Sequence, residues 1–243
     1  MAVRTRSIDF ADGDTALRGT LAWDDARAGR RPGILVAHAW RGRSGFEDDK
    51  ARMLAELGYA GFALDLYGKG VLGESATQNA KLMQPFLDDR AMLARRLHVA
   101  LDTLRAEQVV DPAQIGAIGF CFGGLCVLDL ARSGADVAGV VSFHGLLGAP
   151  PEPQDGPIGA RILVLHGWDD PMATPDAVVA LGRELGARGA DWQLHAYGNT
   201  LHAFTNPAAD DIASGLRYGP LAERRALRSM RDFFADIFSK NNN

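Results

Sequence analysis

The residue best suited to chemistry in this chain of 243 residues is Cys121, at the centre of residues 119–123 (Gly-Phe-Cys-Phe-Gly). The apolar run 115–118 before it predicts a buried strand, and the apolar stretch 122–133 after it predicts a helix. A nucleophile on so sharp a strand-to-helix turn needs small residues two positions away on each side, and both are glycine. The start of a helix favours the thiolate, and the Phe122 N–H is then placed to stabilise an oxyanion.

The alternative is a glycine-rich connection that contains a buried structural cysteine, because Cys is among the residue types most often buried. The glycines and the flanking elements together favour the nucleophile for Cys121. Cys126 lies inside the expected helix between two apolar residues, so we expect it in the core. Two cysteines five residues apart provide neither a disulfide framework nor the spacing of a zinc site.

A cysteine nucleophile needs a base, and the base needs a third group that orients it. In proteins whose nucleophile lies on such a strand-to-helix turn, the acid and then the histidine follow the nucleophile in chain order. Of the six histidines, only His202 lies in a polar, mobile loop after the last expected strand, so it is the expected base. The acid should follow the expected strand 162–166, where Asp169 and Asp170 are adjacent and spacing alone does not choose between them.

The rest of the chain predicts the elements that position these residues. With 47% hydrophobic and 23% charged residues it has the composition of an ordinary globular protein. Short apolar runs alternate with stretches of helical spacing, which predicts an α/β fold in one domain of residues 1–243, with a mainly parallel twisted sheet and helices on both faces. Such sheets bind ligands beyond the carboxyl ends of their strands. The expected strands are 17–23, 33–37, 60–66, 115–118, 137–143, 162–166 and 192–196, and the expected helices are 46–57, 80–105 with a break near Pro85, 122–133, 175–188 and 221–238.

Several classes of function are not expected. The formal net charge is −4 and no basic run is present, so we expect no nucleic-acid partner. No apolar stretch approaches the roughly 20 residues that cross a bilayer. The N-terminus lacks a secretory signal, so we expect a cytoplasmic protein with a frayed tail at 239–243. The histidines lack the paired spacing of metal ligands, and we expect neither a metal nor an organic cofactor.

These motifs resemble the dienelactone hydrolase family of α/β-hydrolases, from about residue 16 to residue 238. The resemblance rests on GFCFGG (119–124), LHGWDDP (165–171), LHAF (201–204) and ALDLYG (63–68), and the cysteine in the first of these is its specific part. The family pattern Gly-x-x-Asp-Pro falls on residues 167–171, so the resemblance implies Asp170 as the acid. It implies a triad of Cys121, Asp170 and His202, with the backbone N–H groups of Phe122 and Trp40 as oxyanion donors.

The chain departs from this family at three positions. Ala39 stands where members that act on dienelactone carry a glutamate, and Ala76 and Asn206 stand where they carry arginines. Dienelactone itself is therefore not the expected substrate. Without the glutamate, we expect Cys121 to rest as a thiolate paired with the His202 imidazolium, reactive and easily oxidised.

Three cations, Arg41, Arg43 and Lys69, are candidates to replace the missing positive charge, although solvated surface is the favoured interpretation for them.

The expected substrate contacts are mostly aromatic. An apolar pocket with few polar anchors suits a small neutral ester or lactone, and the segment 69–86 is expected to cover part of it. One alternative is a redox-sensing or ligand-binding thiol protein that kept the fold without catalysis. Another is acyl transfer to an acceptor other than water, and the oligomeric state stays open. The residues expected to contact substrate are Trp40, Arg41, Tyr67, Phe120 and Phe204.

Overall fold

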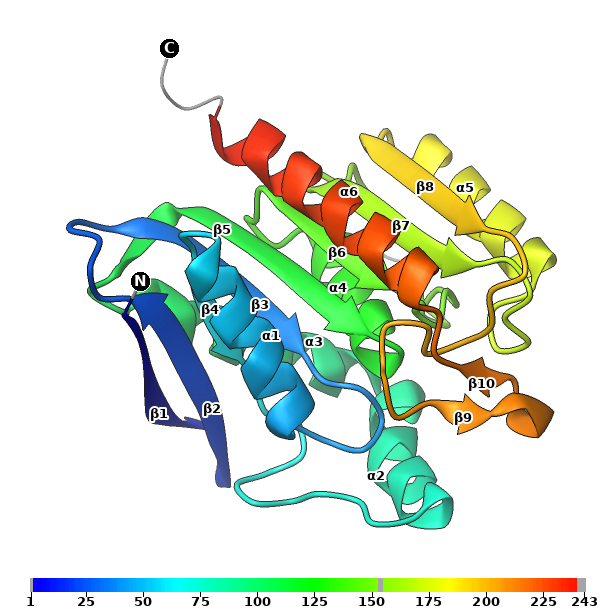
Figure 1. Cartoon of the computed structure of the whole chain (residues 1–243), viewed down its shortest axis with the longest axis horizontal. Helices are drawn as coiled ribbons and strands as arrows, with labels where there is room; N and C mark the ends of the chain where they lie inside the picture. Colours follow the sequence, from blue (N-terminus) through cyan, green and yellow to red (C-terminus); the bar gives the residue numbers. More distant parts are fainter. Residues whose placement is uncertain (1, 153–154, 240–243) are drawn as a thin grey trace. The chain divides into compact units, whose positions relative to one another are not determined.

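Strands and helices alternate along the chain in the computed structural model, which describes residues 2–152 and 155–239 (Figure 1). The chain divides into a first unit, Met1–Ile118, and a second unit, Gly119–Asn243. The expectation of one domain over residues 1–243 stays a prediction. Most of the expected tail, residues 240–243, lies outside the described residues, and residue 239 ends a helix.

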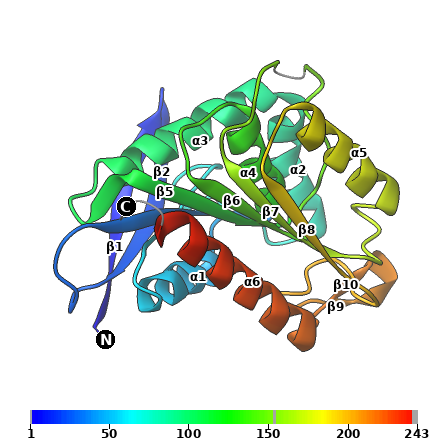
Figure 2. The ribbon, with the colours of Figure 1, turned by 90° about the horizontal axis from the view of Figure 1, so that it is seen from above.

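The first unit has a sheet with the strand order β1-β2-β4-β3. β3 and β4 run parallel, whereas β2 pairs antiparallel with both β1 and β4. Helices cover both faces of this sheet, with α1 on one side and α3 on the other (Figure 2). The elements of this unit are β1 (Val3–Asp12), β2 (Thr15–Asp24), β3 (Arg31–Ala37), α1 (Gly45–Glu56), β4 (Ala60–Ala63), α2 (Ala76–Asp88) and α3 (Arg90–Arg105).

β1 is a strand that the sequence pattern did not predict. It pairs with β2 along its whole length, yet most of its side chains are exposed. Charged residues such as Arg4, Arg6 and Asp9 interrupt the alternation of apolar and polar residues that marks a half-buried strand. Charges of this kind are typical of an edge strand, because they discourage pairing with other chains.

The helix expected over residues 80–105, with a break near Pro85, is two helices, and the break comes at Asp89, just after the proline. α2 begins four residues earlier than expected and continues past the proline to Asp88. Asp89 then caps the start of α3, where its carboxylate accepts a hydrogen bond from the Met92 N–H at 2.8 Å. A capping aspartate satisfies an otherwise unpaired N–H, so it sets the boundary here.

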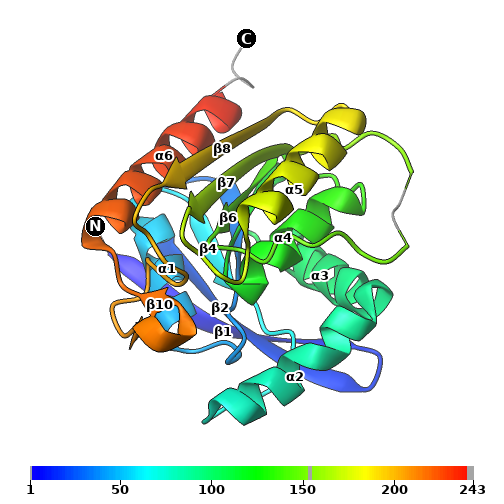
Figure 3. The same ribbon diagram turned by 90° about the vertical axis from the view of Figure 1, so that its right-hand side faces the viewer.

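The second unit has three parallel strands in the order β6-β7-β8. α6 lies on one face of these strands, and α4 and α5 lie on the other (Figures 2 and 3). β9 and β10 form a separate antiparallel pair that the sequence did not predict. β5 (Val110–Phe120) carries the chain into this unit, whose other elements are α4 (Phe122–Arg132), β6 (Gly139–Phe143), β7 (Arg161–Gly167), α5 (Pro175–Ala187), β8 (Trp192–Tyr197), β9 (Asp210–Asp211), a 3₁₀ helix (Ile212–Ser214), β10 (Leu216–Arg217) and α6 (Pro220–Ser239).

The expected fold class is confirmed. In each unit, helices lie on both faces of the strands, and parallel pairs carry the central part of the sheet. Parallel strands end at the same edge, so the loops after β6, β7 and β8 come together in the second unit (Figure 3). Among the described helices, none combines the length and the apolar composition that a membrane crossing requires.

A buried arginine fixes the loop that follows β6. Arg132 lies at the end of α4 with 3% of its side chain exposed, and it bonds Asp129 at 3.1 Å and Glu184 at 2.8 Å. It also donates to the carbonyl oxygens of Leu147 at 3.1 Å and Gly148 at 3.2 Å. One guanidinium group therefore joins α4, α5 and this loop.

We predict that Arg132→Leu lowers the free energy of unfolding by about 3 kcal/mol, because it leaves the Asp129 carboxylate buried without its cation. Urea unfolding followed by circular dichroism measures this change. Arg183→Leu is the matched control, since Arg183 lies on the exposed side of α5. Equal losses in the two variants would contradict the prediction.

Candidate active site

Cys121 lies on a strained turn between β5 and α4. Its backbone has φ +57° and ψ −117°, a conformation that is costly for a residue with a side chain. A Cβ on Gly119 would collide with the carbonyl oxygen of Gly123, so the turn is too tight for any larger residue there. The Cys121 thiol is partly exposed, whereas Cys126 is fully buried in α4, as expected for a core residue. Phe122 is the first residue of α4, so its N–H lies at the helix N-terminus.

Asp170 and His202 form a buried pair. His202 Nδ1 lies 2.7 Å from Asp170 Oδ2, and their side chains are 1% and 0% exposed. The other carboxylate oxygen accepts a hydrogen bond from the Met172 N–H at 2.8 Å, which fixes the orientation of the carboxylate. The neighbouring Asp169 is exposed. Of the two adjacent aspartates, Asp170 is the one that contacts His202.

Backbone contacts bring the acid loop and the histidine loop together. The Asp169 N–H donates to the carbonyl oxygen of Thr200 at 3.1 Å. A Cβ on Gly167 would lie 2.6 Å from that same oxygen, so only glycine permits this approach. The His202 N–H donates to Gly215 at 3.0 Å, and the His202 carbonyl accepts from Arg217 at 3.1 Å. His202 is therefore held on both sides and is 1% exposed, unlike the mobile loop residue expected from the sequence.

The charges around His202 favour its protonated form. Burial lowers the pKa of His202. The negative charge of Cys121 and the hydrogen bonds to Asp170 and Cys121 outweigh this effect and raise the pKa to about 10. Its Nε2 atom is buried and has no oxygen or nitrogen partner within the described residues. An imidazolium that stays protonated at neutral pH stabilises a neighbouring thiolate.

Two other buried histidines lie near this pair. Burial lowers the pKa of His166, and the nearby His202 charge lowers it as well, against the attraction of Asp170. His144 follows β6 directly and is 2% exposed, with φ +37°. Its Nδ1 accepts a hydrogen bond from the Cys121 N–H at 3.2 Å, and its Nε2 lies 2.8 Å from Thr205 Oγ1. Of the three, only His202 contacts a carboxylate.

Phe120 and Phe204 do not have the position expected of substrate contacts. Both side chains are 0% exposed. The Phe120 ring stacks on Phe143 with the centroids 4.8 Å apart, and the Phe204 ring meets His144 edge-on at 5.1 Å. Neighbouring aromatic and histidine rings cover both side chains and leave them no exposed surface for a ligand.

The other three residues expected to contact substrate, Trp40, Arg41 and Tyr67, belong to the first unit. The Tyr67 hydroxyl donates to the Trp40 carbonyl oxygen at 3.0 Å, which fixes Tyr67 against the loop after β3. Arg41 donates to the Gly73 carbonyl oxygen at 2.9 Å. Their roles toward substrate, and that of the Trp40 N–H as oxyanion donor, stay predictions.

The other two candidate cations are bound elsewhere in this unit. Arg43 bonds Asp48 at 2.8 Å, and Lys69 bonds Asp9 at 3.1 Å. Arg41 is exposed and has no carboxylate partner within residues 2–152 and 155–239.

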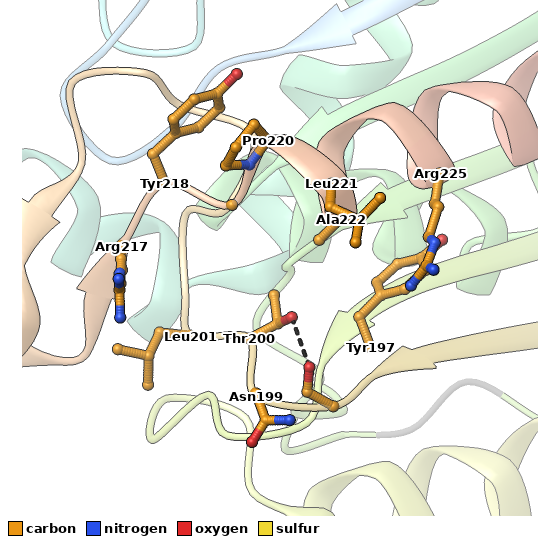
Figure 4. Close-up of a pocket in the computed structure, with 12 residues that line it drawn as sticks. Tyr197, Asn199, Thr200, Leu201, Arg217, Tyr218, Pro220, Leu221, Ala222 and Arg225 are labelled. Atoms are coloured by element: carbon orange, nitrogen blue, oxygen red, sulfur yellow. Dashed lines mark hydrogen bonds between the residues drawn. The ribbon is translucent and has the colours of Figure 1, made fainter.

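A separate cavity of about 520 Å³ opens beside the histidine loop (Figure 4). It lies between the segment before His202 and the start of α6, and neither Cys121 nor Asp170 contributes to its lining. Arg217 and Arg225 lie on its two sides. Within the residues that the structure describes, no group of three or more His, Cys, Asp or Glu side chains gathers so as to hold a metal ion.

Comparison with known proteins identifies the family. A sequence model described as "Dienelactone hydrolase family" matches residues 17–238. The chain belongs to this family. A solved structure titled "m3DLH" superposes on it with a TM-score of 0.94 and 40% identity, covering 98% of this chain and 99% of the other.

Two further similar proteins have more informative names. A dienelactone hydrolase-like promiscuous phosphotriesterase from metagenomic libraries is 37% identical, with a TM-score of 0.93 over 98% of this chain and 99% of its own. A protein from Bradyrhizobium sp. that is named "Probable 2-oxo-3-(5-oxofuran-2-ylidene)propanoate lactonase" is 27% identical over 93% of each chain. The protein, as a member of the dienelactone hydrolase family, is therefore a hydrolase with the α/β-hydrolase fold.

The site of this family member contains two residues that the sequence reasoning did not use, His144 and Thr205. The sequence could have indicated His144 as a site residue, because it stands directly after a strand, as do Cys121 and the acid loop. Its contact with Thr205 depends on the course of the loop after His202, which no local pattern reveals.

We predict that iodoacetamide modifies Cys121 at a rate that is flat between about pH 7 and pH 9, since an imidazolium with a raised pKa keeps the thiolate charged. Mass spectrometry of the modified peptide measures the rate at Cys121 alone. In His202→Ala the rate should rise with pH like that of an ordinary thiol with a pKa of about 8.5. A wild-type rate that rises in parallel with this variant would contradict the prediction.

Proposed function

We propose that this protein hydrolyses a small carboxylic ester or lactone through Cys121, His202 and Asp170, with a covalent acyl-thioester intermediate. The observation that carries the proposal is the buried 2.7 Å contact between His202 and Asp170, on an imidazole whose pKa the Cys121 charge raises. A nucleophile, a base and an orienting acid on three loops at one edge of a sheet suit acyl transfer.

The reaction proceeds in two halves. The Cys121 thiolate attacks the carbonyl carbon, and the N–H groups of Phe122 and Trp40 bind the resulting oxyanion. His202 gives its proton to the alkoxide as the carbon–oxygen bond breaks, which leaves the acyl group on sulfur. His202 then takes a proton from water, the hydroxide attacks the thioester, and the carboxylic acid leaves as the thiolate re-forms. Asp170 orients the imidazole in both halves.

The substrate class follows from the family and from the residues that the chain lacks. Similar proteins are named as a lactonase and as a promiscuous phosphotriesterase. Ala39, Ala76 and Asn206 supply no charge where members that act on dienelactone carry one. A neutral or weakly polar ester or lactone fits this chain better than a lactone that carries a carboxylate, because the chain lacks the two arginines that would bind that carboxylate.

The two alternatives differ from this proposal in measurable ways. A redox-sensing or ligand-binding thiol needs no oriented imidazole, so the buried Asp170–His202 pair argues against it. An acyltransferase shares the first half of the reaction and differs only in the acceptor. Hydrolysis is favoured because water needs no acceptor site.

The test is turnover of p-nitrophenyl acetate, a lactone series and paraoxon by wild type, Cys121→Ala and Asp170→Asn. We expect ester and lactone hydrolysis by wild type, a loss of roughly a thousandfold or more in kcat for Asp170→Asn, and no turnover above background for Cys121→Ala. Rapid-quench mass spectrometry should show one acetyl group on Cys121 in wild type.

Asp169→Asn is the matched control for the acid, since Asp169 is the exposed neighbour of Asp170. Wild-type rates in Cys121→Ala would refute the nucleophile. Faster acetyl release with added amines or thiols than in water alone would favour the acyltransferase.

A further inference from the structure

We propose that His144 is a positioning residue that sets the separation between the nucleophile and the base, with Thr205 as its second anchor. This inference rests on the proposed function and extends it to two residues with no role in the reaction steps. The evidence is a bridge of hydrogen bonds that runs from the Cys121 backbone through one imidazole to the loop that carries His202.

The hydrogen bonds determine the tautomer of the bridge. A backbone N–H can only donate, so the Nδ1 atom of His144, 3.2 Å from the Cys121 nitrogen, accepts and carries no proton. The proton is therefore on Nε2, which donates to Thr205 Oγ1 at 2.8 Å. His144 is neutral in this arrangement and cannot replace His202 as the base, because both of its nitrogens are occupied.

The bridge spans the two groups that must meet. The Cys121 N–H also donates to the Phe143 carbonyl at 3.1 Å, so the turn keeps one backbone partner without His144. Thr205 stands three residues after His202 and is fully buried. The His144 ring meets the His202 ring edge-on, with the centroids 5.2 Å apart and the planes at 66°. The imidazole therefore separates the turn from the base loop as a spacer of fixed length.

The backbone of His144 supports a specific role for its side chain. A φ of +37° is unfavourable for a residue with a side chain, and glycine would adopt it at no cost. Strained residues of this kind persist where the surroundings hold them in place, and they gather at functional sites. Here the two hydrogen bonds of the ring help to hold the strained backbone in place.

Removing either anchor should lower the rate without removing substrate binding. We expect Thr205→Val, which preserves shape and loses the hydroxyl, to lower kcat for p-nitrophenyl acetate roughly tenfold with little change in KM, since small misplacements of reacting groups cost this much or more. His144→Phe should lower kcat at least as much. Thr205→Ser keeps the hydroxyl and should recover most of the loss. Thr103→Val, a substitution of the same type in α3 of the first unit, should leave kcat unchanged.

A second measurement does not depend on turnover. In Thr205→Val and His144→Phe, alkylation of Cys121 should rise between about pH 7 and pH 9, because a thiolate farther from its imidazolium behaves like an ordinary thiol. Thermal unfolding shows whether each variant is folded. If His144→Phe does not fold, Thr205→Val and Thr205→Ser decide the question.

A folded Thr205→Val with the kcat and alkylation profile of wild type would overturn the proposal, and would leave His144 a core residue. Failure of the proposed function is a separate result, since it would appear as turnover by Cys121→Ala. The alkylation profiles would still test the spacer in that case.

Discussion

The 2.7 Å contact between Asp170 and His202 is the interaction on which the rest of the site depends. It places a negative charge in the protein interior, where an unpaired carboxylate is costly. The cost is offset because His202 is charged and because the Met172 N–H binds the second oxygen. The fold provides the approach by placing glycine at 167 and 215, where a side chain would strike the Thr200 carbonyl in one case and Pro171 in the other.

Much of this site could be predicted from sequence, because its parts follow strands. The turn at Cys121 combines glycine spacing with a strand before it and a helix after it, and each of these signals is local. The order of acid and histidine along the chain then narrows the search to short loops. Asp169 and Asp170 show where local reasoning ends, since only a family pattern or the burial of one side chain distinguishes adjacent aspartates.

The parts that sequence did not predict are those whose partners are distant in the chain. β1 carries charges on an exposed edge, so no apolar alternation marks it. A break was expected near Pro85, but its exact position at Asp89 depends on the hydrogen bond with which this aspartate caps the next helix. Phe120 and Phe204 have the residue type of a pocket wall, but their neighbours bury them completely. Thr205 contacts His144 across 61 positions of sequence, and a hydroxyl gives no periodic signal.

Four residues other than glycine have positive φ within the described chain, and all belong to the loops around this site: Cys121, His144, Asn199 and Ala203. Such backbones store free energy that a glycine or a relaxed loop would release. Selection for heat resistance would therefore find easy gains at these positions and lose the reactive geometry with them. Laboratory evolution of a more heat-stable variant of this enzyme therefore has to improve residues outside these loops.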